Sequence, residues 1–419
     1  MMHKYIKLPG ERVLAGRKKE KKWIKFRHKL IRIIVWLPFY VCLRIMYRVD
    51  IRFFKEQEKR PYLILYNHQT VADQFFVGLA VKGGTYYVAS EDIFSNGFIS
   101  KLLKFAIEPI PIKKQTTDIR AVKTCYRVAK EGGSICIAPE GNRTFSGRTE
   151  YMNPAIGSMA KVLSLPIAIF KIQGGYGTQP RWSDGTRKGK MTAGVTRVIK
   201  PEEYKDLSAD ELYQIIRDEL YVNEAVADGE FRSGKRAQYL ERAMYVCPYC
   251  GLSVFESNGN IIRCITCGRE MIYGATKEIK GVGFDFPFKF VAEWYDYQQD
   301  FVNRLDPDCY LEIPMFTDKM SLIGVILYKN KKVLRKSCTS ALYGDRIVFD
   351  EDRDEELTLS FDDIAALSVL GRNKANIYHG EQVYQLKGDK HFNALKYVNI
   401  YYRYRNARKG QSDGKFLGL

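Results

Sequence analysis

The sequence is poor in histidine, and it contains no long apolar run that is free of charge. Only five of its 419 residues are histidines. The longest uncharged apolar run covers residues 33–43, whereas a helix needs roughly 20 apolar residues to cross a bilayer. The N-terminus is charged over too long a stretch for a signal peptide, and no small-residue cleavage site follows an apolar core. We therefore expect neither a signal peptide nor a membrane-spanning helix.

The chain also lacks a balance of charge and a disulfide pattern. It has 67 Lys and Arg against 48 Asp and Glu, which gives a formal charge of +19. Residues 1–60 hold 18 of the basic and 5 of the acidic residues, so about +13 is concentrated there. This favours a polyanionic partner, either nucleic acid or anionic lipid. Nine cysteines, four of them in CxxC pairs, indicate metal binding in a reducing compartment rather than a disulfide framework.

Residues 1–60 are predicted to form a basic segment at the membrane interface. Within it, residues 23–41 mix large apolar and aromatic side chains with Lys and Arg. Such rings suit the acyl boundary of a bilayer, and the cations suit lipid phosphates. Pro38 should break this stretch into two helical pieces. The alternative is an amphipathic helix that packs on its own domain.

Residues 61–240 are predicted to form an α/β domain with a mainly parallel sheet, because apolar runs of strand length alternate with helical stretches. The clearest helix covers residues 117–131, with Thr116 or Thr117 as its N-cap. Another opens at the capping-box signature that begins with Ser208 and continues to about residue 224. The strands are expected at residues 62–66, 86–89, 135–138 and 165–170.

His68 follows the first of these strands, where open α/β sheets place reactive groups. Asp73 lies five residues further on. If His68 is in the turn before a helix and Asp73 in its first turn, the carboxylate can hold one imidazole nitrogen and leave the other as a base. The alternative is a structural histidine, which is the commoner role of a lone His beside an apolar stretch.

A second polar motif, residues 138–144, follows the strand at residues 135–138. Gly141 would let the backbone approach a ligand closely, and Arg143 offers a planar fork for a phosphate. Glu140 can accept hydrogen bonds from a polyol or from the arginine. The alternative is a polar turn with a surface salt bridge. Lys113 and Lys114, after another strand-like piece, are a second candidate phosphate site or simply solvated cations.

Together these motifs resemble the glycerolipid acyltransferases of the 1-acylglycerol-3-phosphate acyltransferase family. Residues 67–73, Asn-His-Gln-Thr-Val-Ala-Asp, look like the family's first motif. Residues 138–144, Ala-Pro-Glu-Gly-Asn-Arg-Thr, resemble its Phe-Pro-Glu-Gly-Thr-Arg-Ser block, and residues 165–170 resemble its last, apolar block. The order and spacing fit over roughly residues 25–220. Departures are Thr70 for the usual Ser, Ala138 for Phe, Asn142 for Thr, and Lys113 or Lys114 for Arg.

The resemblance implies that a lipid hydroxyl attacks a thioester directly, without an acyl-enzyme. His68 would be the base and Asp73 would orient it. Arg143, with Lys113 or Lys114, would bind the phosphate of a lysophospholipid such as 1-acylglycerol-3-phosphate, while Glu140 and Gly141 shape that site. The donor would be acyl-CoA or acyl carrier protein, and the protein would lie on the cytoplasmic face of a membrane, peripheral or monotopic.

Residues 241–275 are predicted to form a zinc ribbon. The four ligands would be Cys247, Cys250, Cys264 and Cys267, in a CxxC–x13–CxxC pattern with a glycine after each pair. Four thiolates satisfy a tetrahedral zinc ion in a closed, structural site. The insert between the pairs carries one basic residue, Arg263, which makes a nucleic-acid partner unlikely.

The remaining chain is predicted to contain a linking segment, residues 276–315, with an amphipathic helix at 284–305. A β-rich domain then covers residues 316–419 and ends in a helix from about Asp389 to residue 405. The series of strands before one C-terminal helix loosely resembles a pleckstrin-homology or GRAM-type domain. We therefore interpret the chain as a membrane-surface acyltransferase with two appended units. The alternatives are transfer to another lysolipid, a nucleic-acid-binding zinc-ribbon protein, or a non-catalytic lipid-binding protein.

Overall fold

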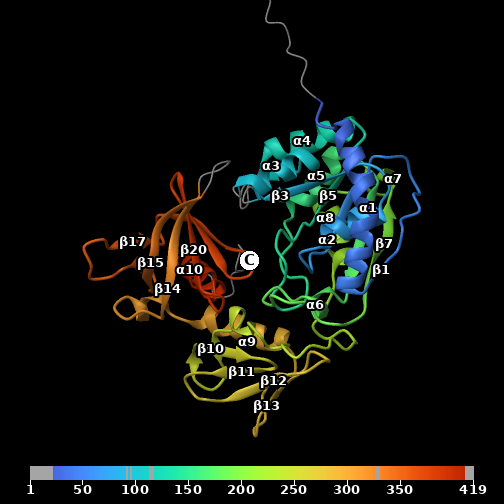
Figure 1. Ribbon diagram of the computed structural model, residues 1–419. Coiled ribbons are helices and arrows are strands. Elements are labelled where there is room, and N and C mark those ends of the chain that lie inside the picture. Colours follow the sequence, from blue (N-terminus) through green and yellow to red (C-terminus); the bar gives the residue numbers. More distant parts are fainter. Residues whose placement is uncertain (1–21, 91–92, 95–96, 113–117, 326–330, 411–419) are drawn as a thin grey trace, which may run out of the picture.

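A computed structural model describes residues 22–90, 93–94, 97–112, 118–325 and 331–410 of the chain. Figure 1 shows an α/β unit on the right, the small strands β10–β13 below it, and an antiparallel sheet with helix α10 on the left. The expected fold class is confirmed: a mixed, mainly parallel sheet flanked by helices, a four-cysteine cluster and a further antiparallel sheet are all present.

The α/β unit is built on a seven-stranded sheet with strand order β1-β7-β6-β2-β5-β3-β4. Neighbouring strands are parallel except for the antiparallel pair β6 and β7. The strands are β1 (Val49–Ile51), β2 (Leu63–Tyr66), β3 (Thr85–Ser90), β4 (Ile110–Ile112), β5 (Ser134–Ile137), β6 (Ile167–Gln173) and β7 (Met191–Ile199). Strand β2 therefore lies in the middle of the sheet, with its carboxyl end between those of β5 and β6.

Helices cover both faces of this sheet, and β2 shows why its sequence has no polar break. Ile64 and Tyr66 pack into one hydrophobic cluster with α1 and α2, whereas Leu63 and Leu65 pack into another with α4, α5 and α8. A strand buried on both faces needs an apolar residue at every position. The helices are α1 (Phe26–Tyr47), α2 (Asp73–Ala80), α3 (Gly97–Ala106), α4 (Ile119–Lys130), α5 (Ala155–Leu163), α6 (Gly175–Thr178), α7 (Pro201–Tyr204) and α8 (Ala209–Leu220).

The two predicted helix starts have different outcomes. Ser208 caps α8 in a reciprocal capping box: its hydroxyl accepts from the Glu211 amide at 3.1 Å, and the Glu211 carboxylate accepts from the Ser208 amide at 2.7 Å. Helix α4 is instead capped by Asp118, whose carboxylate accepts from the amides of residues 120 and 121 at 3.0 and 3.1 Å. Thr116 and Thr117, the expected caps, lie outside the described residues.

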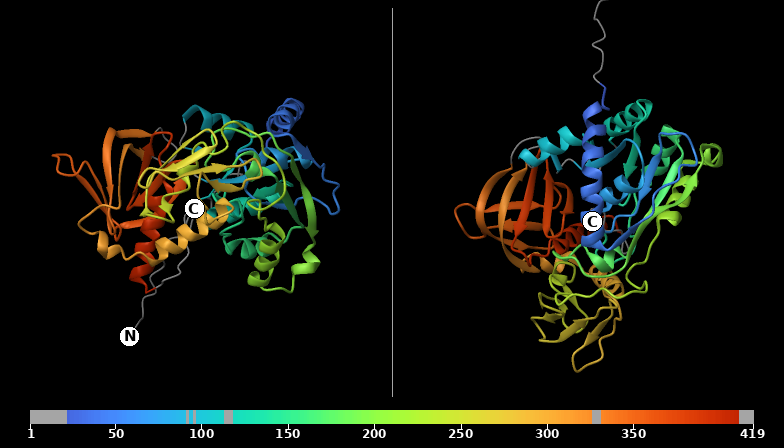
Figure 2. Two further views of the ribbon diagram at one scale, coloured as in Figure 1. Left: turned by 90° about the horizontal axis from the view of Figure 1, so that it is seen from below. Right: turned by 45° about the vertical axis from the view of Figure 1, so that its right-hand side comes forward.

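Helix α1 corrects two expectations. It runs as one 22-residue helix through Pro38 instead of breaking there, and it is long and apolar enough to cross a membrane by length and composition alone. Contacts on both sides of the proline hold it: the Arg32 guanidinium donates to the Gly78 carbonyl at 2.9 Å, and Leu43 and Tyr47 are buried. These tertiary contacts offset the hydrogen bond that proline removes. Figure 2 shows α1 on the outer surface of the α/β unit.

The ribbon and the C-terminal sheet share one hydrophobic core. The ribbon contains β8 (Val246–Cys247), β9 (Gly251–Leu252), β10 (Phe255–Asn258), β11 (Ile261–Cys264), β12 (Glu270–Tyr273) and β13 (Ile279–Gly281), preceded by the short 3-10 helix η2 (Leu240–Arg242). Helix α9 (Val291–Arg304) and the 3-10 helix η3 (Pro307–Tyr310) follow. Trp294 of α9 contacts Phe255 of the ribbon, and Tyr245 contacts Phe316 of the C-terminal sheet. The ribbon thus shares its core with α9 and the C-terminal sheet. The boundaries given above for the separate domains stay a prediction.

The C-terminal unit is an antiparallel sheet of seven strands in the order β17-β16-β15-β14-β20-β19-β18, packed against α10. Its elements are β14 (Phe316–Val325), β15 (Lys332–Leu342), β16 (Arg346–Phe349), β17 (Leu357–Ser360), β18 (Ile364–Leu370), β19 (Lys374–His379), β20 (Gln382–Gly388) and α10 (Leu395–Arg408). The final helix begins later than predicted and is not capped by Asp389. The Asn393 side-chain oxygen, Oδ1, accepts from the Leu395 and Lys396 backbone amides instead, at 2.8 and 3.1 Å.

Candidate active site and metal cluster

The carboxyl end of β2 is fixed by Asn67, to which the sequence assigned no role of its own. Its side chain is fully buried and makes two hydrogen bonds with Ile172 of β6, donating to the carbonyl at 2.8 Å and accepting from the amide at 2.7 Å. An amide side chain can satisfy both backbone groups at once, because it carries a donor and an acceptor. This holds the turn in which the next residue, His68, is placed.

His68 and Asp73 lie in direct contact, as their spacing predicted. The His68 Nδ1 atom lies 2.8 Å from Asp73 Oδ2. Asp73 is the first residue of α2 and is fully buried. Its carboxylate also accepts from the Gln69 amide at 2.6 Å, the Thr70 amide at 2.9 Å and the Thr70 hydroxyl at 2.6 Å. A carboxylate held this way keeps the proton of a neutral imidazole on Nδ1 and leaves Nε2 with a free lone pair.

The second motif meets the first. The Glu140 carboxylate accepts from the backbone amide of His68 at 2.9 Å, although 72 positions separate these residues. Arg143 is buried, and the negative charge of Asp73 acts on its guanidinium. Gly141 adopts a left-handed backbone with φ of 69°, and a Cβ atom added there would meet nothing within 4 Å. Glycine is therefore favoured at 141 by the backbone conformation rather than by lack of space.

Burial changes the acid–base properties of this second motif. Burial raises the pKa of Glu140 to about 8, and the hydrogen bond from the His68 amide opposes this rise. Burial, and to a smaller extent the positive charge of Arg372, lowers the pKa of Arg143 to about 10. At pH 7 Glu140 is thus mostly neutral and Arg143 is still a cation. The Arg143 Nη1 atom is buried and has no hydrogen-bond partner, which is a costly arrangement unless an anion binds there.

The raised pKa of Glu140 leads to a testable pH dependence of stability. The folded state holds a proton that the unfolded state releases above about pH 4.5. Folding is therefore favoured at low pH, and this advantage is lost as the pH rises towards 8. Glu140→Gln stays neutral and keeps its acceptor for the His68 amide. Between pH 5 and pH 8.5 the wild type should therefore lose more free energy of unfolding than Glu140→Gln. We expect this loss to differ by roughly 2–4 kcal/mol.

Chemical denaturation at the two pH values measures this difference. The exposed Glu256 provides a matched control, and Glu256→Gln should follow the wild type at both. Parallel pH curves for Glu140→Gln and the wild type would contradict the burial of a neutral carboxyl at this position.

Two predicted substrate-binding residues remain, the lysines that follow β4 in the sequence. Lys113 and Lys114 lie outside the described residues, so their part in a phosphate site stays a prediction. Two functional candidates had no sequence signal at all: Arg181, in the loop after α6, and Arg372, in the turn between β18 and β19. The Arg181 guanidinium donates to the Arg143 carbonyl at 2.8 Å. Neither arginine belongs to a recognisable motif, and only the fold brings them near Arg143.

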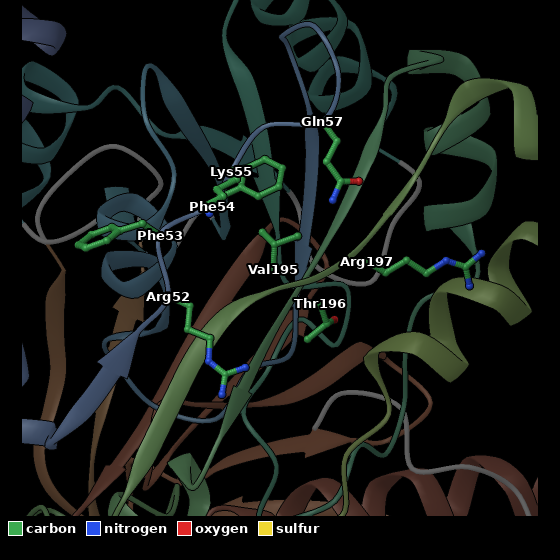
Figure 3. Close-up of a pocket in the computed structure, with 8 residues that line it drawn as sticks. All are labelled: Arg52, Phe53, Phe54, Lys55, Gln57, Val195, Thr196 and Arg197. Carbon is green, nitrogen blue, oxygen red and sulfur yellow. The ribbon is translucent and has the colours of Figure 1, made fainter.

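A cavity of about 220 Å³ at the β1–β7 edge lies in a different part of the α/β unit (Figure 3). It is lined by Arg52, Phe53, Phe54, Lys55, Gln57, Val195, Thr196 and Arg197. Arg197 is already paired with two carboxylates, Glu203 and Glu219. None of the predicted catalytic or substrate-binding residues lines this cavity, and we assign it no role in the chemistry.

The four predicted cysteine ligands form one cluster. Their sulfur atoms all lie within 4.8 Å of one another. Cys247 Sγ is 3.8 Å from Cys267 Sγ, and Cys250 Sγ is 3.6 Å from Cys264 Sγ. Four thiolates around one zinc ion at about 2.3 Å would be about 3.8 Å apart at the edges of a tetrahedron, so the cluster could hold a metal ion. The glycines after each pair, Gly251 and Gly268, have positive φ values of 76° and 73°.

The fold and site define a class of protein: a mainly parallel α/β domain that presents an oriented imidazole, a neutral carboxyl and a buried cation at the end of its central strand. A comparison with known protein families matches the same part of the chain. Residues 48–172, which include His68, Asp73, Glu140 and Arg143, match the model of the acyltransferase family. Over these residues the chain is similar to the acyltransferase family.

Other comparisons add little to this assignment. The crystal structure of the 1-acyl-sn-glycerophosphate (LPA) acyltransferase PlsC from Thermotoga maritima is similar to this chain with 18% sequence identity and a TM-score of 0.37. The match covers 46% of this chain and 75% of that chain. No curated protein matches the sequence. The reaction is therefore inferred from the residues of the site.

Proposed function

We propose that the protein transfers a fatty acyl chain from a thioester donor, acyl-CoA or acyl carrier protein, to the hydroxyl of a lysophospholipid such as 1-acylglycerol-3-phosphate. The observation that carries this proposal is the tethering of the two motifs. Asp73 orients the base candidate His68, and the His68 backbone amide donates to Glu140. The loop of Glu140 also carries Arg143, whose buried Nη1 atom has no hydrogen-bond partner. A base and an anion-binding cation are what a phosphorylated alcohol needs for attack on a thioester.

The proposed steps use the residues in place. His68 Nε2 takes the proton of the acceptor hydroxyl while that oxygen attacks the thioester carbonyl. The resulting imidazolium is stabilised by Asp73. The tetrahedral intermediate then collapses, the carbon–sulfur bond breaks, and the thiolate leaves with the proton returned by His68. Backbone amides near Gly141 are the candidates for stabilising the oxyanion, and Arg143 holds the acceptor phosphate.

A membrane surface is the proposed place of the reaction. Exposed apolar side chains of α1 include Phe26, Ile33 and Ile45, with 80%, 64% and 74% of their surface accessible. Helix α3 packs beside α1 and exposes Phe98 and Phe105. Such an apolar surface with many neighbouring cations fits the interface of an anionic bilayer. We place the protein on the cytoplasmic face, and we assign zinc as the structural ion of the cysteine cluster.

An acyl-transfer assay across a panel of lysolipids tests the proposal. The full-length protein is incubated with lysolipids that carry a phosphate monoester, a phosphodiester or no phosphate, each with acyl-CoA and with acyl carrier protein thioester. We expect the highest kcat/KM for the phosphate monoester, because Arg143 binds a dianion best. Equal binding to anionic vesicles and to DNA at matched salt, with no transfer to any lysolipid, would favour the nucleic-acid alternative instead.

A further inference from the structure

The C-terminal sheet reaches the candidate active site through Arg181. This side chain has only 2% of its surface exposed, and all three guanidinium nitrogens donate hydrogen bonds. Nη1 binds the Arg143 carbonyl at 2.8 Å, Nε binds the Gly371 carbonyl at 2.8 Å, and Nη2 binds the Val369 carbonyl at 3.3 Å. Arg181 therefore ties the Arg143 loop to the turn between β18 and β19.

Arg372 is the next residue in that turn. One of its terminal nitrogens, Nη1, lies 3.3 Å from a carboxylate oxygen of Asp184. Its Nε atom is buried and has no hydrogen-bond partner, as is true of Arg143 Nη1. The positive charge of Arg372 is the largest electrostatic contribution to the lowered pKa of Arg143, after burial. Arg181 bridges the Arg143 carbonyl and the Gly371 carbonyl, so Arg143 and Arg372 belong to adjoining loops.

The carboxylates near these arginines do not balance their charge. Asp184 is shared between Arg372 and the buried Arg242, to which it is bound at 2.7 Å. Asp73 is engaged by His68 and two backbone amides. Glu140 carries little charge at pH 7 because burial raises its pKa to about 8. Excess positive charge beside two buried nitrogen atoms without partners, Arg143 Nη1 and Arg372 Nε, is costly, and a bound anion would offset that cost.

We propose that Arg372 is a second binding residue for the acceptor phosphate, so that the appended C-terminal unit completes the acyltransferase site. This inference rests on the proposed function, because it names the group that the same site recognises. Arg143 and Arg372 would hold the phosphate from two sides. Arg181 is a positioning residue, since each of its three guanidinium nitrogens donates to a backbone carbonyl of the two loops. The phosphates of acyl-CoA could bind to the same arginines. Separate KM values for the lysolipid acceptor and for acyl-CoA distinguish these two sources of phosphate.

Kinetics of Arg372→Ala in the full-length protein provide the first test. We expect the KM for lysophosphatidate to rise about 10- to 100-fold, with the KM for acyl-CoA unchanged, because a lost charge-assisted hydrogen bond affects the acceptor alone. Arg372→Lys should recover part of the loss. Arg353→Ala is the matched control: Arg353 lies in the same unit, paired with Asp350 and largely exposed. A rise in the KM for acyl-CoA instead would assign Arg372 to the donor and overturn the proposal.

Binding of inorganic phosphate, measured by calorimetry, gives a second test that needs no activity. We expect Arg372→Ala to weaken this binding about 10-fold or more, whereas Arg353→Ala should leave it unchanged. Unaltered binding in Arg372→Ala, or an equal loss in both variants, would overturn the role of Arg372. If phosphate binds in an Arg372-dependent way but no lysolipid is acylated, the proposed function fails and the anion site stands.

Discussion

Replacing His68 with alanine is expected to abolish acyl transfer, with kcat lowered by at least about 10²–10⁴-fold. The imidazole is the group that takes the hydroxyl proton in the proposed mechanism, and its partner Asp73 cannot replace it, because that carboxylate is buried and engaged by four donor groups. The measurement is a steady-state acyl-transfer assay with lysophosphatidate and acyl-CoA.

Two further measurements make this result specific. Thermal unfolding and metal content of His68→Ala should stay close to those of the wild type, since the imidazole is partly exposed and the Asp73 carboxylate keeps its three other donor groups. His379→Ala is the matched control, because His379 ends strand β19 in the C-terminal sheet and belongs to no site. Transfer at the wild-type rate by His68→Ala would remove this histidine from the mechanism.

Loss of the metal ion is expected to have the largest effect on stability. Structural zinc supplies about 10–16 kcal/mol of apparent binding free energy in small zinc-binding peptides. The cysteine cluster lies in the ribbon, whose core continues into α9 and the C-terminal sheet. Cys264→Ser, at a fully buried ligand, should therefore lower the midpoint of thermal unfolding strongly and should reduce the bound metal below one ion per chain.

Elemental analysis and thermal unfolding with and without a chelator measure these effects. Cys309→Ser is the control, because Cys309 is exposed and lies outside the cluster. Its metal content and unfolding midpoint should equal those of the wild type. A protein that keeps its unfolding midpoint after complete removal of the metal would contradict a structural role for the cluster.

The sequence predicted best where one local pattern had only one physical solution. The uninterrupted apolar run before Asn67 required burial on both faces, and β2 indeed packs into two hydrophobic clusters. The two CxxC pairs predicted four neighbouring thiols, and their sulfur atoms lie close enough together to bind a single metal ion. Local rules were less reliable inside α1 and at two helix ends. Pro38 does not interrupt α1, and Asp118 and Asn393 cap α4 and α10 in place of the predicted residues. Helix ends fray, so contacts with the rest of the fold help to decide where a helix begins.

The sequence by itself determined the α/β class, the His68–Asp73 contact and the four-cysteine cluster, since each depends on residues close together in the chain or on a fixed spacing. Only the tertiary structure decided that Glu140 binds the His68 amide and that Arg181 joins Arg143 to the turn of Arg372. These contacts join segments far apart in the chain, and no periodicity or spacing encodes them. The physical reason is that charge balance in a buried site depends on which groups the whole fold brings together.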